Sequence, residues 1–136
     1  MPKTIIVPID VGHPDKAPEM LAIARKLGGD DARIVLINVV IDVPVYVAVE
    51  LPGGLIEKAK ENARSELTKI AGAAGVEAEI EVRNGQAATA ILAAASEKHA
   101  DVIIIASHHP DLSDYFLGST AARVVRHASC SVHVMR

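Results

Sequence analysis

Two segments in the last third of the chain combine residue types that bind phosphate. The first, from Asp101 to Pro110, reads D-V-I-I-I-A-S-H-H-P, an apolar strand that leads directly into small polar residues. The second begins at Leu117 with L-G-S-T and continues with helical spacing. A helix start leaves backbone N–H groups unpaired and carries partial positive charge, so a glycine and two hydroxyls there can hold phosphate oxygens without a lysine. Together the two segments predict an anion pocket.

The composition limits the kind of fold that can position this pocket. The 136 residues have the size of one ordinary domain, so we expect a single domain over residues 1–136. Apolar residues make up 50% of the chain, but only 2% are aromatic and Trp is absent, so the core must consist of Val, Ile, Leu and Ala. This composition suits helices packed on a parallel sheet.

Charge and hydropathy exclude several classes of partner. The net charge is −3 and acidic and basic residues are mixed along the chain, which does not favour binding to nucleic acid. No apolar run approaches membrane-spanning length, and no signal-peptide pattern follows Met1, so we expect no membrane insertion. The single cysteine, Cys130, cannot form an internal disulfide, and we expect a cytoplasmic protein.

Strand-like and helix-like segments alternate along the chain. Short β-branched runs predict strands, and longer segments with apolar residues three or four apart predict helices. Prolines and paired glycines interrupt residues 41–54, which we expect to form a loop. The predicted strands are residues 4–9, 34–40, 77–82, 102–105 and 131–135, and the predicted helices are residues 17–27, 55–74, 86–98 and 119–127.

This alternation predicts a three-layer α/β sandwich, because each crossover between parallel strands needs an intervening helix. The most apolar strands belong in the centre, which gives a five-stranded parallel sheet of order 3-2-1-4-5 with four helices. In such a sheet the chain leaves the first and fourth strands toward opposite faces, and ligands bind in the crevice at their carboxyl ends. Asp10 and the segment from Ser107 to His109 lie at that crevice.

Several segments resemble a universal stress protein domain, in order and over nearly the whole chain. They are K-T-I-I-V-P-I-D at residues 3–10, I-V-L-I-N-V at 34–39, the A-S-H-H-P and L-G-S-T segments above, and R-H-A-S-C-S-V-H-V-M-R at 126–136. The resemblance implies the fold argued above, a dimer, and membership of either an ATP-binding or a non-binding group. The binders' glycine signature is altered here, since Ala106 and His109 replace glycines and eight residues separate His109 from Gly118. The pattern A-S-H-x-P followed by L-G-S resembles a bacterial subgroup that still binds nucleotide.

The resemblance also implies a set of binding residues for ATP, with or without Mg²⁺. The backbone of Ile9 and Val39 would pair with the adenine edge, and Asp10 would accept a hydrogen bond from a ribose hydroxyl or hold a metal ion on the phosphates. His109 adds bulk beside the phosphates and, as a cation, can also pair with them. The implied set is Pro8, Ile9, Asp10, Val39, Ala106, Ser107, His109, Gly118, Ser119 and Thr120.

Structural roles compete with these functional ones. Ser119 alone is better explained as a helix N-cap, and Asp10 can equally cap the turn at His13 and Pro14. The histidine spacing in the loop lacks a closed ligand set, so we predict no metal site of the protein's own. Cys130 has no His and carboxylate arrangement around it and is predicted to be a buried structural thiol.

We therefore predict an ATP-binding regulatory module of stress response and assign no catalytic residue, because no P-loop, dinucleotide fingerprint or nucleophile elbow is present. Two alternatives stay open: a dimeric interaction protein that binds no nucleotide, and a slow ATP hydrolase or autokinase. The last strand lies at an open sheet edge and is predicted to pair with its copy in a homodimer. The pairing residues are Ser131, Val132, His133 and Val134.

Overall fold

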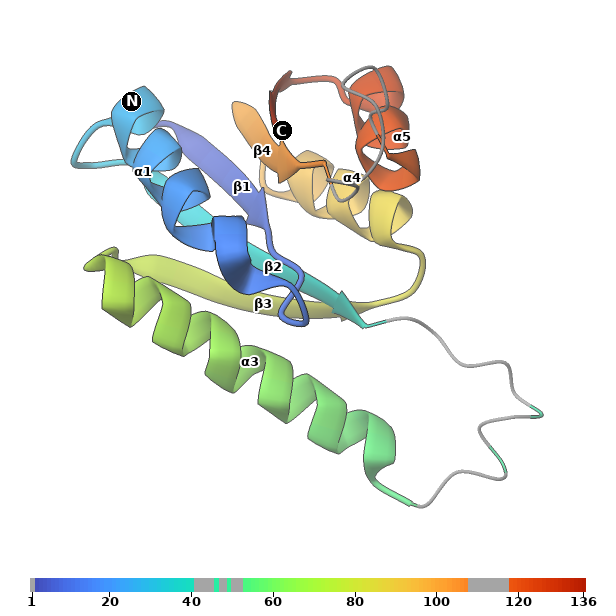
Figure 1. Ribbon diagram of the computed structural model, residues 1–136. Helices are drawn as coiled ribbons and strands as arrows, with labels where there is room; N and C mark the ends of the chain where they lie inside the picture. The colour runs from blue at the N-terminus through green and yellow to red at the C-terminus, as the bar shows by residue number, and fades with distance from the viewer. Residues whose placement is uncertain (1, 41–45, 47–48, 50–52, 108–117) are drawn as a thin grey trace.

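The chain forms one sheet of five parallel strands in the order β3-β2-β1-β4-β5, as the computed structural model shows (Figure 1). The structure describes residues 2–40, 46, 49, 53–107 and 118–136. Its elements are β1 (Thr4–Pro8), the 3₁₀ helix η1 (Pro14–Lys16), α1 (Ala17–Gly28), β2 (Arg33–Val40), α3 (Leu55–Ala74), β3 (Ala78–Asn84), α4 (Ala87–Glu97), β4 (Val102–Ala106), α5 (Ser119–His127) and β5 (Ser131–Met135).

The predicted fold class and strand order are confirmed, and the described residues contain the four expected α-helices. Helices α3 and α5 and strand β5 have the predicted bounds, while the other predicted elements differ from prediction by one or two residues. The unpredicted η1 begins at Pro14, whose fixed φ suits the first position of a helical turn. The loop predicted for residues 41–54 lies outside the described residues except for positions 46, 49, 53 and 54.

Two helical layers cover the two faces of the sheet (Figure 1). On one face, α1 and α3 bury Leu21 and Leu67 against side chains of β1 and β2 such as Ile5 and Leu36. On the other face, α4 and α5 bury Ile91 and Val124 in a second cluster. The chain thus leaves β1 toward one face and β4 toward the other, and this switch point is where such a fold opens a crevice.

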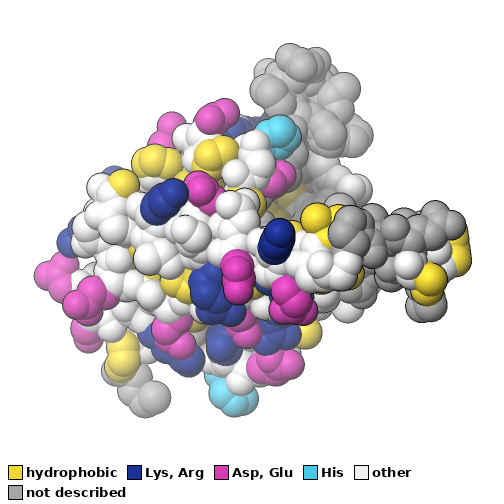
Figure 2. Space-filling model, turned by 90° about the horizontal axis from the view of Figure 1, so that it is seen from below, with side chains coloured by type: hydrophobic (Ala, Val, Ile, Leu, Met, Phe, Trp, Pro, Cys, Tyr) yellow, Lys and Arg dark blue, Asp and Glu magenta, His cyan; other side chains and the backbone are white. Residues whose placement is uncertain are grey.

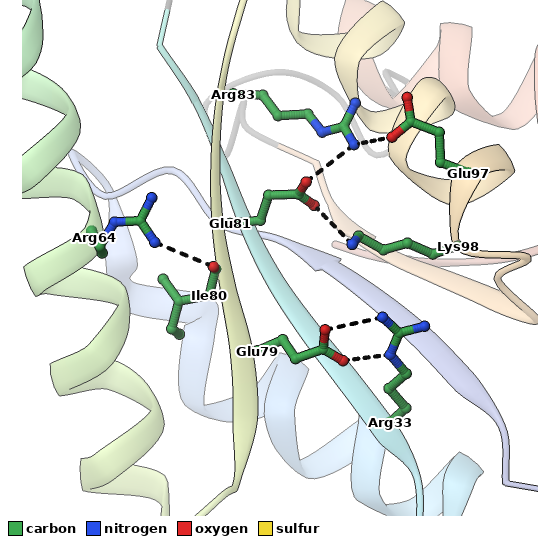
Figure 3. A network of polar contacts seen from close by, with 8 residues as sticks. All are labelled: Arg33, Arg64, Glu79, Ile80, Glu81, Arg83, Glu97 and Lys98. Carbon is green, nitrogen blue, oxygen red and sulfur yellow. Dashed lines mark hydrogen bonds and ion pairs between the residues drawn. The ribbon is translucent and has the colours of Figure 1, made fainter.

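The outer part of β3 carries a group of ion pairs that we call the β3 ion network (Figure 3). Arg33 of β2 forms a bidentate ion pair with Glu79, and Arg83 donates hydrogen bonds to both Glu81 and Glu97. Glu81 Oε2 is buried without a hydrogen bond and lies 3.6 Å from Lys98 Nζ, close enough for an ion pair. The members of the network are Arg33, Glu79, Glu81, Arg83, Glu97 and Lys98.

The exposed charges follow the same mixed pattern. Figure 2 shows Lys and Arg side chains interspersed with Asp and Glu side chains over one face of the molecule. Among the described residues, no helix is both long enough and apolar enough to cross a membrane.

Candidate functional site

A cavity of about 500 Å³ lies at the carboxyl ends of β1, β2 and β4, where the fold predicts a crevice. Its volume falls in the range of small-molecule sites, roughly 300–1,000 Å³. We call it the switch-point cleft. The described residues that line it are Pro8, Ile9, Asp10, His13, Asp15, Lys16, Ala17, Met20, Ile37, Asn38, Val39, Ala87, Ile91, Ile105, Ala106, Ser107 and Thr120.

The end of β1 is held firmly against β2. Ile9 N donates to Ile37 O at 2.8 Å, and the buried Asn38 side chain donates from Nδ2 to Ile9 O at 2.8 Å. The Ile9 N–H is therefore already bonded within the protein, and the pairing of the Ile9 backbone with an adenine edge stays a prediction. Strand pairing extends one residue past Pro8, and this uses the donor.

A tight turn follows β1 and aims the next segment across the cleft. Asp10 Oδ1 accepts a hydrogen bond from Gly12 N at 2.9 Å, and Asp10 O accepts one from His13 N at 3.0 Å. This is the turn-capping role predicted for Asp10 as the alternative to ligand binding. The second carboxylate oxygen is the acceptor that the turn leaves to other partners, since Asp10 is exposed and lines the cleft.

The backbone of Val39 faces the cleft for a reason of strand geometry. Ile37 O accepts from Ile9 on the β1 side, whereas Val40 O accepts from Gly85 on the β3 side. Successive residues of a strand direct their backbone groups to alternate sides, so Val39 directs its N–H and C=O toward the β1 side. Strand β1 has already ended at that level, and these two groups therefore border the cleft.

The end of β4 forms the opposite wall. Ser107 is buried, and its N–H donates to Met135 O of β5 at 2.8 Å. Its carbonyl oxygen lies 3.5 Å from Lys16 Nζ, a contact that joins segments 91 residues apart. Ala106 is also buried and lines the cleft beside Ser107.

The N-cap of helix α5 lies one residue before the predicted N-cap, Ser119. Gly118 is the N-cap, with φ 86° and ψ 147°, and Ser119 is the first helical residue. The N-cap role predicted for Ser119 is therefore wrong. The physical reason is that the chain enters the helix with a positive φ, which only glycine adopts without strain.

The cleft brings together most of the positions that the sequence predicted. Pro8, Ile9, Asp10, Val39, Ala106, Ser107 and Thr120 line it. Gly118 and Ser119 are described but do not line it, and His109 lies outside the described residues.

Sequence reasoning missed four polar side chains of the cleft: His13, Asp15, Lys16 and Asn38. Asn38 had a detectable signal, because it is the polar residue within the apolar run of residues 34–40. The signal for His13, Asp15 and Lys16 is their position after the carboxyl end of a strand, where ligands bind in this architecture.

Two other chemistries find little support. No group of three or more His, Cys, Asp or Glu side chains is arranged to hold a metal ion within the residues that the structure describes. Cys130 is half-buried against the α4 and α5 cluster, and burial raises the pKa of its thiol, with Asp101 adding to the shift. A raised pKa keeps the thiol protonated, which fits a structural role and not that of a nucleophile.

Comparison with known proteins identifies the family of this chain. The sequence profile of the Universal stress protein family matches residues 1–136. The chain belongs to the universal stress protein family. Universal stress protein G of Escherichia coli O157:H7 is 30% identical over 145 aligned positions that cover 100% of both chains. The family resemblance drawn from the sequence is thus confirmed.

Solved structures of the family share the fold. A universal stress protein crystallised in complex with cAMP superposes with a TM-score of 0.67, at 19% identity, over 99% of this chain and 97% of the other. The Archaeoglobus fulgidus universal stress protein in complex with dAMP superposes with a TM-score of 0.65, at 22% identity, over 98% of each chain. At these identities the likeness concerns the fold alone.

Proposed function

We propose that the switch-point cleft binds an adenine nucleotide, ATP being the expected ligand, and that the protein is a nucleotide-responsive regulatory module of stress response. The observation that carries the proposal is the unused backbone direction of Val39 beside an apolar slot. Ile37, Ile91 and Ile105 supply apolar surface for a planar base, while the N–H and C=O of Val39 present a donor and an acceptor. An adenine edge carries the complementary acceptor and donor.

The polar residues of the cleft suit the rest of a nucleotide. The free carboxylate oxygen of Asp10 is an acceptor for a ribose hydroxyl, and Ser107 and Thr120 supply hydroxyls to phosphate oxygens. Two relatives of the same fold were solved with cAMP and with dAMP, which supports an adenine ligand for this chain.

A magnesium ion would enter together with the phosphates of ATP. Asp10 and Asp15 are the carboxylates among the described residues of the cleft, which is fewer oxygen ligands than a dedicated protein site provides. They fit a shared role in which the phosphates supply most of the coordination. We therefore expect ATP binding to persist, with weaker affinity, when Mg²⁺ is removed by a chelator.

The test is calorimetric titration of the intact protein with ATP, AMP and GTP, together with melting curves at increasing nucleotide concentration. We expect saturable binding of ATP and a higher melting temperature, with a smaller effect of GTP, because the Val39 backbone groups match adenine. Absence of any heat or shift at millimolar ATP with magnesium would contradict the proposal and favour the interaction protein. Phosphate release above background that is lost in Asp10→Ala would instead identify a hydrolase.

The proposed module acts as a homodimer. Strand β5 is an edge strand, and within the predicted pairing segment of Ser131, Val132, His133 and Val134 the backbone groups of Val132 and Val134 point away from β4, where a second copy can pair with them in antiparallel register. Light scattering at micromolar concentration tests this, with a monomer as the contradicting result. Val132→Pro removes one donor at the edge and is expected to shift the population toward monomer.

A further inference from the structure

Lys16 is a cation in an unusual position. It is the N-cap residue of α1, a 12-residue helix, and its side chain is half-buried in the switch-point cleft. The N-terminal end of a helix carries partial positive charge, so a cation there is disfavoured. The N-terminal end of α1 therefore does not stabilise the positive charge of Lys16.

The contacts of Lys16 within the protein do not compensate for this unfavourable placement of its charge. Lys16 Nζ lies 3.5 Å from Ser107 O, whereas a normal N–H···O bond is about 2.9 Å long. Within the described part of the chain no carboxylate lies within ion-pair distance of it. By contrast, Arg83 and Lys98 of the β3 ion network each lie within 4 Å of a carboxylate, at 3.1 Å and 3.6 Å from Glu81.

The surroundings of Lys16 in the cleft point to an anionic ligand. Its ammonium group lies beside Ser107 at the end of β4, and Thr120 of α5 supplies a second hydroxyl group to the same cleft. His13 is the other basic side chain among the described residues of the cleft. Of the two carboxylates among the described residues of the cleft, Asp10 already accepts a hydrogen bond from Gly12 N at 2.9 Å, and Asp15, the neighbour of Lys16 in sequence, does not lie within ion-pair distance of it.

We propose that Lys16 binds the phosphate of the nucleotide and makes the cleft select phosphorylated adenosine over adenosine itself. The ammonium group exchanges its long contact with Ser107 O for a charge-assisted bond to a phosphate oxygen. It supplies positive charge from the β1 side of the cleft. The inference rests on the proposed function and names the residue that decides its ligand class.

The experiment compares Lys16→Met with the unmodified protein in titrations with ATP, AMP and adenosine. We expect Lys16→Met to bind ATP and AMP about ten- to a hundred-fold more weakly, in keeping with the strength of a hydrogen bond between charged groups, and to bind adenosine with unchanged affinity. Lys16→Arg keeps the charge and is expected to restore most of the ATP affinity. Lys69→Met, at an exposed lysine of α3, is the matched control and leaves every affinity unchanged.

Salt dependence provides a second readout that a structural role would not change. ATP affinity of the unmodified protein is expected to fall more steeply with KCl concentration than that of Lys16→Met, because one ion pair is absent from the variant. Equal ATP affinity in both proteins would overturn the role of Lys16 and leave the proposed function standing. If the unmodified protein binds neither ATP nor adenosine, the proposed function fails, and this inference fails with it.

Discussion

The switch-point cleft and the β3 ion network differ in how far their charged side chains are paired within the protein. In the network, Arg33 pairs with Glu79, and Arg83 donates hydrogen bonds to Glu81 and Glu97 (Figure 3). In the cleft, Lys16 has only a 3.5 Å contact with a carbonyl, and the Asp10 carboxylate is half used by its own turn. Both regions are polar, yet the charges of the network are paired with one another, whereas Lys16 of the cleft has no carboxylate within ion-pair distance among the described residues.

This difference distinguishes polar groups that stabilise the fold from polar groups that are available to bind a ligand. Paired charges show shifted ionisation: hydrogen bonds to Glu97 and Glu81 raise the pKa of Arg83, and the bond from Arg33 lowers the pKa of Glu79. The cost of desolvating them is offset inside the protein. A polar group that lines a cavity without such a partner is the better candidate for binding.

The largest expected effect comes from Gly118, whose backbone conformation sets the start of α5 beside the cleft. Gly118→Val forces a side chain into a region of positive φ and is expected to lower the free energy of unfolding by about 2 kcal/mol. It should also weaken ATP binding, because Thr120 moves with the helix start. Urea denaturation and calorimetry measure the two effects.

The control for this variant is Gly72→Ala in α3, where an added methyl group meets no atom within 4 Å. Here the loss of a glycine is expected to stabilise the protein by about 0.5–1 kcal/mol. Equal stability changes in both variants would show that the conformation of Gly118 is not the cause.

A smaller effect is expected when the network loses its central cation. Arg83→Met leaves Glu97 without its arginine partner and Glu81 with Lys98 alone, and we expect the free energy of unfolding to fall by about 1–2 kcal/mol, between the values for exposed and buried pairs. ATP affinity should not change. Lys26→Met, at an exposed lysine of α1, serves as the control, and a loss of ATP affinity in Arg83→Met would break the separation between the two regions.

The acid limb of the stability curve sharpens the comparison further. The pKa values of Glu79 and Glu97 are lowered, in each case chiefly by a hydrogen bond from an arginine. Their contribution is complete above the ordinary glutamate pKa of about 4.3 and is lost as pH falls through the lower folded-state values. The double variant Glu79→Gln, Glu97→Gln should therefore be less stable at pH 7 and lose less stability on acidification, measured by urea denaturation from pH 7 to pH 3. Lys16→Met should follow the unmodified protein, and an unchanged acid slope in the double variant would contradict this account.

The smallest effect concerns an ion pair that belongs to neither region. Glu66 and Lys69 lie one helical turn apart on α3, 3.6 Å from each other, and the lysine side chain is 72% exposed. Glu66→Gln is expected to change the free energy of unfolding by no more than about 0.5 kcal/mol, because solvent screens such pairs. A larger loss by urea denaturation would show that surface pairs outside the β3 ion network also stabilise the fold.

Much of the site could be predicted from residues at the ends of strands. Ser107 was expected at the crevice because the carboxyl ends of parallel strands meet at one edge of the sheet, and the family resemblance implied Val39 and Ala106. All three line the cleft, and their binding of a nucleotide stays a prediction. Lys16 and Asn38 were missed, since their contacts join residues 91 and 29 positions apart. The bond from Ile9 N to Ile37 O could not be foreseen either, because the exact length of strand pairing is a property of the folded sheet.

The sequence by itself determined the layers, the strand order and the edge of the sheet where a ligand would bind. Hydrophobic periodicity and the alternation of strands with helices suffice for these, because they decide which faces must be buried. Only the tertiary structure decided which charges are satisfied within the protein and which are left to a ligand. That distinction depends on distances of a few ångströms between side chains of different elements, which strand register and helix packing set and residue order does not reveal.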